Sequence, residues 1–238
     1  MDSDNIKKII DRVVEHFSPL SIFLYGSRAR DDFLPCSDYE IGVLFDKKNM
    51  VDEVKLKEVV NTDSQFKIYP YESESFISGD FDLPFETAIF LRQITFGGIT
   101  LWGNKIIESM QIPPVTVICI MRDIKFYIGR ASDAIVCGNS GYNKIASQLF
   151  FKSCLLGCKD LIILETGIFP ISYKEILHIS KSIDLKKYSG ITDKAYKSRV
   201  DGIFTQKDLL DNVWFLNKFV ERRIIETYRK TGDAVLIK

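Results

Sequence analysis

The chain has 238 residues, of which 46% are hydrophobic and 27% charged, a balance typical of a globular protein with one large or two small cores. Its 32 Lys and Arg residues are matched by 32 Asp and Glu residues, and this zero net charge argues against a long DNA or RNA partner. The acidic N-terminus lacks the layout of a signal peptide and no apolar run approaches the ~20 residues of a membrane span, so we expect a soluble, cytoplasmic protein.

The first half of the chain combines helix and strand patterns. Apolar residues recur at helical spacing over residues 6–17, and Pro19 ends that helix. Short apolar runs predict three buried strands, at residues 20–25, 39–45 and 65–71. A turn and a partly helical stretch follow the first strand, and a helix over residues 51–60 follows the second. Pro70 marks the third strand as an edge or its end. Residues 85–107 are mixed in pattern, with a helix through Phe90 and Leu91.

The second half of the chain is helical in pattern. Pro113 and Pro114 form the best linker, because adjacent prolines resist both helix and strand interiors. Helices are predicted over residues 116–136, 143–165 and 205–229, with a further helix that a capping box at Ser172–Glu175 opens. Gly167 fits the residue just past a helix end. We therefore expect an α+β protein, with a mixed sheet flanked by helices in residues 1–112 and an all-α helical bundle in residues 113–238.

The cysteines and histidines favour structural roles. The five cysteines, an odd number, do not suit a secreted disulfide scaffold: Cys36, Cys119, Cys137, Cys154 and Cys158. Cys154 and Cys158 share one helical face, but a zinc site needs further ligands, and the histidines are only His16 and His178. We expect buried free thiols and structural histidines.

The pattern with chemical content is Leu24-Tyr25-Gly26-Ser27-Arg28-Ala29-Arg30, followed by Ser37-Asp38-Tyr39-Glu40-Ile41-Gly42-Val43. A glycine turn after a buried strand lets an anion approach the backbone, and Ser27 adds a hydroxyl donor. Asp38 and Glu40 are two apart on a strand, so both side chains leave the same face. Two adjacent carboxylates repel each other unless a cation lies between them, and hard oxygen ligands suit Mg2+ or Mn2+. Either motif alone favours a turn or a solvated strand, but together they predict metal-assisted phosphoryl or nucleotidyl transfer.

This stretch resembles the polymerase-β-like nucleotidyltransferases, which carry Gly-Ser, roughly ten residues, and then Asp-x-Asp or Asp-x-Glu in an apolar strand. Here ten residues, 28–37, separate Ser27 from Asp38. The resemblance covers residues 20–110 and implies a Mg2+-bound nucleoside triphosphate, ATP or another NTP, whose nucleoside monophosphate is transferred with loss of pyrophosphate. Gly26 and Ser27 would bind the triphosphate, and Asp38 and Glu40 would bind the metal. Arg28 and Arg30 either pair with phosphate oxygens or are solvated surface arginines.

The family pattern includes a third carboxylate on a following strand, and the third strand here contains no acid. Lys67, Tyr69 and Tyr71 share one of its faces. Glu72 at its end is our candidate for the third catalytic acid, with Glu74 and Glu86 as alternatives. Without a base, the two-carboxylate metal site would still bind ATP and work slowly.

The helical half resembles aminoglycoside adenylyltransferases in two passages, residues 158–167 and Ser172–Glu175. Arg92–Gly97 resembles a further segment of those enzymes, in which the position of Gln93 holds a catalytic glutamate, and an amide cannot take a proton. Arg222, Arg223 and Arg229 have no histidine downstream, which disfavours the RNase chemistry of helical domains paired with such enzymes.

Two functions remain open at this point. The first is a Mg2+-dependent enzyme that transfers AMP or another NMP to a hydroxyl of a small molecule or protein. The second is a catalytically weak or inactive nucleotide-binding regulator, similar to antitoxin-like members of the family, that acts through its helical domain. A homodimer is an open alternative to a monomer, and no membrane partner is expected.

Overall fold

The computed structural model describes residues 3–35, 37–61, 65–81 and 83–238. The chain folds into two compact units. Unit 1 consists of residues 1–82 and 90–112, and unit 2 consists of residues 83–89 and 113–238. The segment 83–89 thus packs with the helical part of the chain, although it precedes the linker at Pro113 and Pro114. The division into domains at residue 112 stays a prediction.

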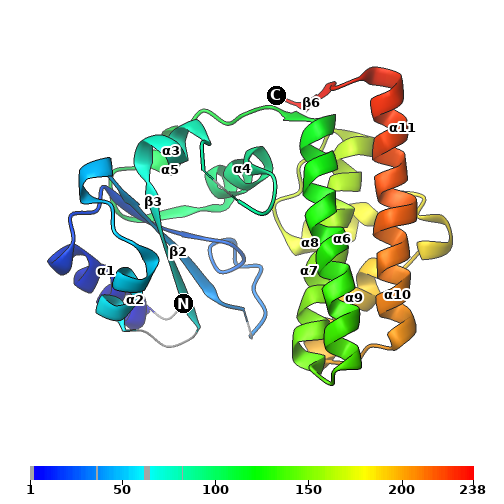
Figure 1. Ribbon diagram of the computed structural model, residues 1–238, viewed down its shortest axis with the longest axis horizontal. Coiled ribbons are helices and arrows are strands. Elements are labelled where there is room, and N and C mark those ends of the chain that lie inside the picture. Colours follow the sequence, from blue (N-terminus) through cyan, green and yellow to red (C-terminus); the bar gives the residue numbers. More distant parts are fainter. Residues whose placement is uncertain (1–2, 36, 62–64, 82) are drawn as a thin grey trace. The chain divides into compact units, whose positions relative to one another are not determined.

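Unit 1 is built on a four-stranded mixed sheet (Figure 1). Its strands are β1 (Ser21–Tyr25), β2 (Tyr39–Phe45), β3 (Phe66–Glu72) and β4 (Ile99–Gly103). The spatial order is β3-β2-β1-β4, with β1 antiparallel to both β2 and β4 and with β2 parallel to β3. Pro70 lies in the edge strand β3, where a residue without an N–H is tolerated. The mixed sheet expected from the sequence is confirmed.

Helices cover both faces of this sheet. The helices of unit 1 are α1 (Ser3–His16), η1 (Lys47–Asn49), α2 (Glu53–Val60), α3 (Ser73–Ser78), α4 (Thr87–Gly97) and α5 (Ile106–Ser109), of which α4 begins in unit 2. Ile9 and Val13 of α1 and Leu56 of α2 pack with inward residues of the strands in one apolar cluster. Phe76 of α3 and Leu91 of α4 belong to a second cluster, on the opposite face. This second face also bears Glu40.

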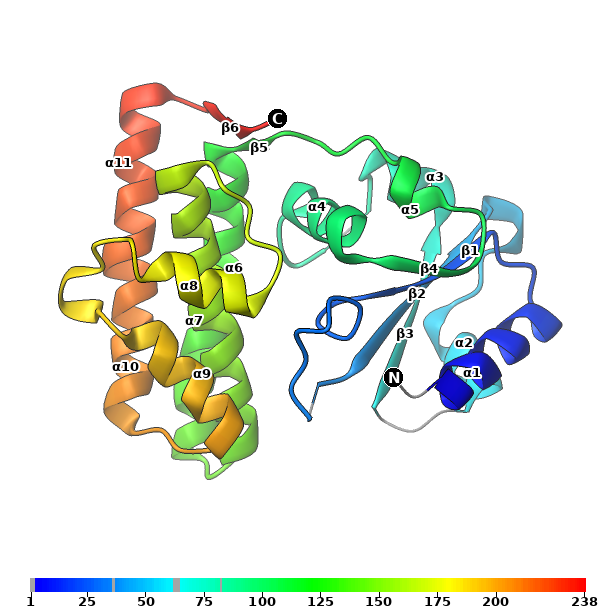
Figure 2. The same ribbon diagram turned by 180° about the vertical axis from the view of Figure 1, so that it is seen from behind.

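Unit 2 is a helical bundle with a small two-stranded sheet (Figure 2). Its helices are α6 (Val117–Asn139), α7 (Asn143–Thr166), α8 (Tyr173–Ser180), η2 (Lys186–Tyr188), α9 (Ile191–Asp201), α10 (Gln206–Trp214), the π-helical η3 (Phe215–Val220) and α11 (Glu221–Thr231). Helix α7 lies at the centre of the bundle, as its nearly all-round apolar pattern predicts. Its end is capped by Gly167 in the left-handed conformation.

Several local features differ from the sequence expectations. Residues 27–31 form turns rather than a helical stretch, closed by a hydrogen bond of 3.0 Å from the Asp32 N–H to the Ser27 carbonyl. The last long helix contains the π segment η3, and α9 was not expected. Strands also return after Pro114, where β5 (Val115–Thr116) pairs with β6 (Val235–Ile237), a contact between distant segments that no local pattern encodes.

The described cysteines are free thiols, at positions 119, 137, 154 and 158, and only the last two are buried. Cys36 lies outside the described residues. Ser172 caps α8 as predicted, accepting a hydrogen bond from the Glu175 N–H at 3.1 Å, but the Glu175 carboxylate accepts from the Ile171 N–H instead of closing the box. Within the described residues, every helix is too short or too polar to cross a lipid bilayer.

Candidate active site

The glycine turn and the acidic pair meet at one end of β1 and β2. Asp38 directly precedes β2, and Glu40 is the second residue of that strand. Both are half-buried, while Tyr39 between them is only 4% exposed and points into the core. The pleat therefore places the two carboxylates on the same face. In the antiparallel register Glu40 lies opposite Tyr25, the residue immediately before Gly26.

Gly26 leaves space that the Glu40 carboxylate fills. The backbone of Gly26 has φ +75°, a conformation that glycine adopts without strain. A Cβ placed at this position would lie 1.9 Å from Oε2 of Glu40. The carboxylate thus lies directly against the turn, and any side chain at position 26 would displace it. The sequence suggested that glycine serves the approach of a phosphate, and the structure adds a second reason, which is room for the acid.

Two tyrosines and a lysine from β3 lie on the face of Glu40. Lys67 is its neighbour in the parallel register, and Tyr69 and Tyr71 follow at alternate positions. Burial raises the pKa of the Tyr69 phenol, and the negative charges of Glu40, Glu53 and Asp38 raise it further. The hydroxyls of Tyr25 and Tyr71 lie 3.3 Å apart. These phenols stay neutral near pH 7, so they offer hydroxyl groups beside the carboxylates.

Glu72 is not brought to this pair. It lies in register with Phe45 at the far end of the strands, five residues beyond Lys67, which is about 16 Å along a strand. Its carboxylate caps α3, where it accepts hydrogen bonds from the backbone N–H groups of Glu74 and Ser75 and from the Ser75 hydroxyl at 2.6–3.0 Å. These hydrogen bonds lower the pKa of Glu72, so the carboxylate is held as an anion at the helix N-terminus. In this structure Glu72 therefore serves as a helix cap, and its role as third catalytic acid stays a prediction that these contacts do not support.

The alternative acids are placed elsewhere as well. Glu74 is exposed in the first turn of α3. Glu86 belongs to unit 2, where its N–H donates to Asp123 Oδ1 at 3.0 Å and its carboxylate lies 3.9 Å from Arg122. Among the residues that the structure describes, no group of three or more His, Cys, Asp and Glu side chains has metal-binding geometry. Two carboxylates still fit Mg2+, which binds through one or two carboxylates together with water and substrate phosphates.

The two arginines after Ser27 differ in their partners. The Arg28 guanidinium donates from Nε and Nη2 to the Ser37 carbonyl, at 3.1 and 3.0 Å, and lies over the ring of Phe33. In Arg30, by contrast, Nε and Nη1 are buried without a hydrogen-bond partner in the described part of the chain. Arg28 is thus occupied within its own loop, and Arg30 retains donors for an anion.

A second set of titratable side chains lies in the core of unit 2. Asp123 of α6 is 1% exposed, and Lys159 and Asp160 of α7 are 1% and 0% exposed. Both carboxylate oxygens of Asp160 lack a hydrogen-bond partner within the described ranges. Burial raises the pKa of Asp160, the negative charge of Asp123 raises it further, and Lys159 partly offsets both. This cluster was not expected from the sequence, although the Lys-Asp pair inside an apolar helix is a visible signal.

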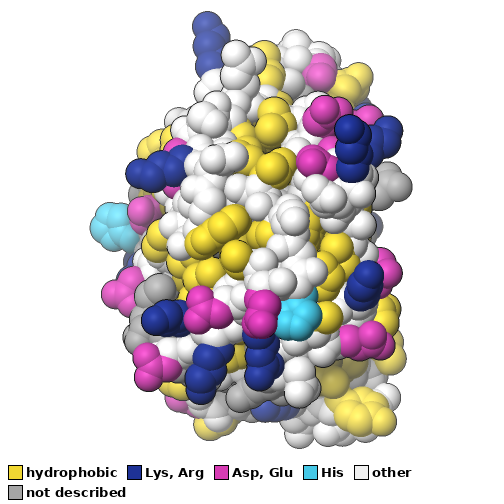
Figure 3. All heavy atoms as spheres, turned by 90° about the vertical axis from the view of Figure 1, so that its left-hand side faces the viewer, with side chains coloured by type: hydrophobic (Ala, Val, Ile, Leu, Met, Phe, Trp, Pro, Cys, Tyr) yellow, Lys and Arg dark blue, Asp and Glu magenta, His cyan; other side chains and the backbone are white. Residues whose placement is uncertain are grey.

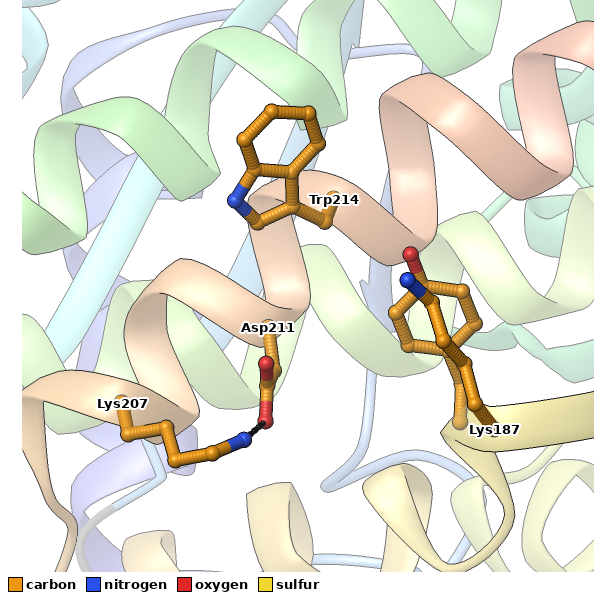
Figure 4. Close-up of a pocket in the computed structure, with 5 residues that line it drawn as sticks. Lys187, Lys207, Asp211 and Trp214 are labelled. Carbon is orange, nitrogen blue, oxygen red and sulfur yellow. Dashed lines mark hydrogen bonds and ion pairs between the residues drawn. The ribbon is translucent and has the colours of Figure 1, made fainter.

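Unit 2 also has a surface hollow of about 510 Å³, lined by Lys187, Tyr188, Lys207, Asp211 and Trp214 (Figure 4). Lys207 and Asp211, one turn apart on α10, form an ion pair there. The hollow offers an aromatic wall and ammonium groups but no second carboxylate among these lining residues. It lacks the acid pair that nucleotidyl transfer needs, so the start of β2, with Asp38 and Glu40, remains the candidate active site.

Comparison with known proteins bears on the family and the fold. Residues 7–83 match the family model for polymerase beta nucleotidyltransferases. Among solved structures, the chain is similar to spectinomycin adenyltransferase AAD(9) from Enterococcus faecialis, which was crystallised with ATP and spectinomycin. The TM-score is 0.61 at 13% sequence identity, and the match covers 94% of this chain and 99% of that one. The comparison with curated proteins found no match. The expected resemblance and the expected fold class are confirmed.

Proposed function

We propose that this chain, whose residues 7–83 form a polymerase-β-type nucleotidyltransferase domain, transfers a nucleoside monophosphate to a hydroxyl group. The donor is a nucleoside triphosphate, ATP in the first instance, and the acceptor is a small molecule or a protein. The cofactor is Mg2+ or Mn2+. The acceptor oxygen forms a bond to the α-phosphorus, the bond from that phosphorus to the bridging oxygen breaks, pyrophosphate leaves, and the hydroxyl proton passes to solvent.

The observation that carries the proposal is the contact between Gly26 and Glu40. A polyphosphate that approaches the turn at Gly26 and Ser27 meets a carboxylate immediately beside it. Anion and carboxylate would repel each other at that separation unless a divalent cation lies between them. The turn and the acid pair therefore make sense together as a site for a metal-bound triphosphate. Neither motif alone would require one.

Each side chain has a defined role in this site. Asp38 and Glu40 would hold the metal, which when bound would neutralise charge on the phosphate oxygens. The backbone of Gly26 and the hydroxyl of Ser27 would orient the triphosphate. The neutral phenols of Tyr25, Tyr69 and Tyr71 lie along the same face as Glu40 and would limit the water around the reacting groups.

A small acceptor is favoured over a polynucleotide. The net charge of the chain is zero, and on the face drawn in Figure 3 dark blue basic and magenta acidic side chains are interspersed rather than gathered into a basic tract. A grip on long nucleic acid needs many phosphate contacts from Lys and Arg. The solved neighbour contains ATP and spectinomycin, which supports a nucleotide donor and a small hydroxylated acceptor for this chain as well.

One observation favours the regulatory alternative. The β3 residue beside Glu40 is Lys67, a cation, and Glu72 is engaged as a helix cap, so the described part of the site holds two carboxylates rather than three. An acceptor hydroxyl then has no third carboxylate to take its proton. A protein of this kind would bind nucleotide, turn it over slowly, and act through its helical unit.

Calorimetry with ATP, in the presence and absence of Mg2+, tests the proposal. We expect binding that requires the metal and that is lost in Asp38→Ala, while Asp11→Ala, which changes an exposed acid of α1, binds as the wild type does. Pyrophosphate release in the presence of candidate acceptors then separates the enzyme from the regulator. Metal-independent binding, or binding that Asp38→Ala leaves intact, would contradict the metal site.

A further inference from the structure

The loop between the glycine turn and the acid pair contains two arginines that make very different contacts. Arg28 and Arg30 are two residues apart in a segment of turns, and both are half-buried. Each ends in a guanidinium, a cationic group with several N–H donors. A phosphate-binding role would be natural for either, and the contacts discriminate between them.

Arg28 is committed to the loop itself. Its Nε and Nη2 both donate to the carbonyl of Ser37, and Nη2 also lies 3.5 Å from the carbonyl of Pro35. The guanidinium lies over two rings, 4.0 Å from the centroid of Phe33 and 4.5 Å from that of Tyr39. Two donors on one carbonyl and two aromatic faces fix the plane of the guanidinium. These contacts engage two of the three guanidinium nitrogens within the loop itself.

The contacts of Arg28 bracket the metal-binding acid. Ser37 precedes Asp38 and Tyr39 follows it, so Arg28 holds the chain on both sides of this residue. Strand pairing begins only at Tyr39, whose N–H donates to the Gln65 carbonyl at 2.8 Å. The Arg28 contacts therefore help to fix where β2 begins and where the Asp38 side chain emerges.

Arg30 shows the opposite arrangement. Its Nε and Nη1 atoms are buried and have no hydrogen-bond partner among the described residues. Buried donors without partners are costly, and charged donors are more costly than neutral ones. An anion that accepts from these atoms would remove that cost. A phosphate oxygen is a strong acceptor for charged N–H donors of this kind.

We propose that the two arginines divide the work of the site. Arg28 is a positioning residue for Asp38 and governs metal affinity, whereas Arg30 binds a phosphate of the nucleotide. This inference rests on the proposed function and refines it, because it separates the metal half of the site from the nucleotide half. It also removes Arg28 from the nucleotide-binding residues expected from the sequence.

Two binding measurements on matched variants test the division. Mn2+ affinity without nucleotide is measured by electron paramagnetic resonance, and ATP affinity at saturating Mn2+ is measured by calorimetry. We expect Arg28→Met to weaken Mn2+ binding by about 10- to 100-fold, the usual effect of losing a group that orients a ligand. Arg30→Met should leave Mn2+ affinity within about twofold and weaken ATP binding by about 10- to 100-fold, as the loss of charged hydrogen bonds predicts.

A conservative variant separates positioning from folding. Arg28→Lys keeps the charge and the contact with the rings but cannot donate twice to Ser37, so we expect Mn2+ affinity between those of the wild type and Arg28→Met. Circular dichroism melting of each variant shows whether the fold is retained, and Arg28→Lys carries the test should Arg28→Met fail to fold.

The outcomes that overturn the inference are distinct from those that overturn the function. Normal Mn2+ affinity in both Arg28 variants, or unchanged ATP affinity in Arg30→Met, overturns the division between the two arginines. The proposed function still stands in that case, provided that the wild-type protein binds Mn2+ and ATP. Failure of the wild-type protein to bind Mn2+ overturns both.

Discussion

Each unit of the molecule holds a pair of carboxylates, and the two pairs differ in their access to solvent. Asp38 and Glu40 are half-buried at the start of β2, beside a turn that a ligand can approach. Asp123 and Asp160 are 1% and 0% exposed in the core of the helical unit. Like charges at short range need a partner in both places. An open pair can recruit a hydrated metal ion, whereas a closed pair has to find its partner within the protein.

In the closed pair, protonation of a carboxyl and the nearby ammonium group of Lys159 reduce the repulsion between the two acids. Burial raises the pKa values of both carboxyls, and the ammonium of Lys159 lowers them in part. Asp123 Oδ1 also accepts the Glu86 N–H, so the pair helps to hold the segment 83–89 on α6. The comparison teaches that access, rather than residue type, separates a metal site from a structural acid pair.

The largest expected effect is the loss of Mn2+ binding when the carboxylates of the open pair, but not those of the closed pair, are neutralised. Asp38→Asn combined with Glu40→Gln should weaken Mn2+ binding by more than about 100-fold, because both carboxylates of the proposed metal site lose their charge. Asp123→Asn combined with Asp160→Asn should leave Mn2+ binding unchanged. Paramagnetic resonance of free Mn2+ measures both. Loss of Mn2+ binding in the second double variant would contradict the assignment of Asp123 and Asp160 as a structural pair.

Gly26→Ala should displace the Glu40 carboxylate from its position beside Asp38 while keeping both acids in the chain. The new Cβ would lie 1.9 Å from Oε2 of Glu40, on a backbone with φ +75°. We expect a loss of about 1–3 kcal/mol in unfolding free energy from strain, and weaker Mn2+ binding because Glu40 has to move. Urea unfolding and Mn2+ titration measure the two effects.

Gly129→Ala is the matched control, because a Cβ at that position in α6 meets nothing within 4 Å. A helical glycine replaced by alanine gains up to about 1 kcal/mol, so this variant should be more stable with normal Mn2+ affinity. Equal stability changes in the two variants would contradict the steric account of Gly26.

The closed pair should make stability depend on pH. An Asp with a raised pKa binds its proton more tightly in the folded protein than in the unfolded chain, whose Asp pKa is ~3.9. Stability is therefore fully present at low pH and falls as the pH rises toward the raised pKa, by at most about 1.4 kcal/mol per pH unit for one proton. Urea unfolding from pH 5 to pH 8 measures this slope.

Asp160→Asn should flatten that dependence. An amide resembles the protonated carboxyl in shape, so the variant should be closest to the wild type near pH 4 and should exceed its stability by a margin that grows toward pH 8. A slope that is the same in Asp160→Asn as in the wild type would show that the proton is held elsewhere.

The smallest effect is expected at Glu72, which belongs to neither pair. Glu72→Ala removes the cap of α3, so thermal stability should fall slightly. Metal and ATP affinities should stay at wild-type values, because the carboxylate lies at the far end of β3. A fall in either affinity would restore Glu72 to the active site.

The sequence predicted the elements that local patterns encode. The three strands at residues 20–25, 39–45 and 65–71 correspond to β1, β2 and β3, and the nearly all-round apolar pattern of residues 143–165 corresponds to the buried helix α7. The pairing of β5 with β6 escaped prediction because its partners are more than a hundred residues apart. The spacing of the motifs predicts that the glycine turn and the acid pair lie close together, and the antiparallel pairing of β1 with β2 brings Glu40 to Gly26. The contacts of Arg28 with its own loop and of Glu72 with α3 depend on tertiary geometry that sequence spacing does not reveal.

The contact between Gly26 and Glu40 also constrains how this site can change over evolution. Because the carboxylate occupies the volume that a side chain at position 26 would need, neither residue can be replaced by a larger one independently. A lineage that acquires alanine at position 26 would have to shorten the acid at position 40 in concert, to aspartate or smaller. The two positions should therefore co-vary among descendants that keep the metal, and drift apart in those that lose it.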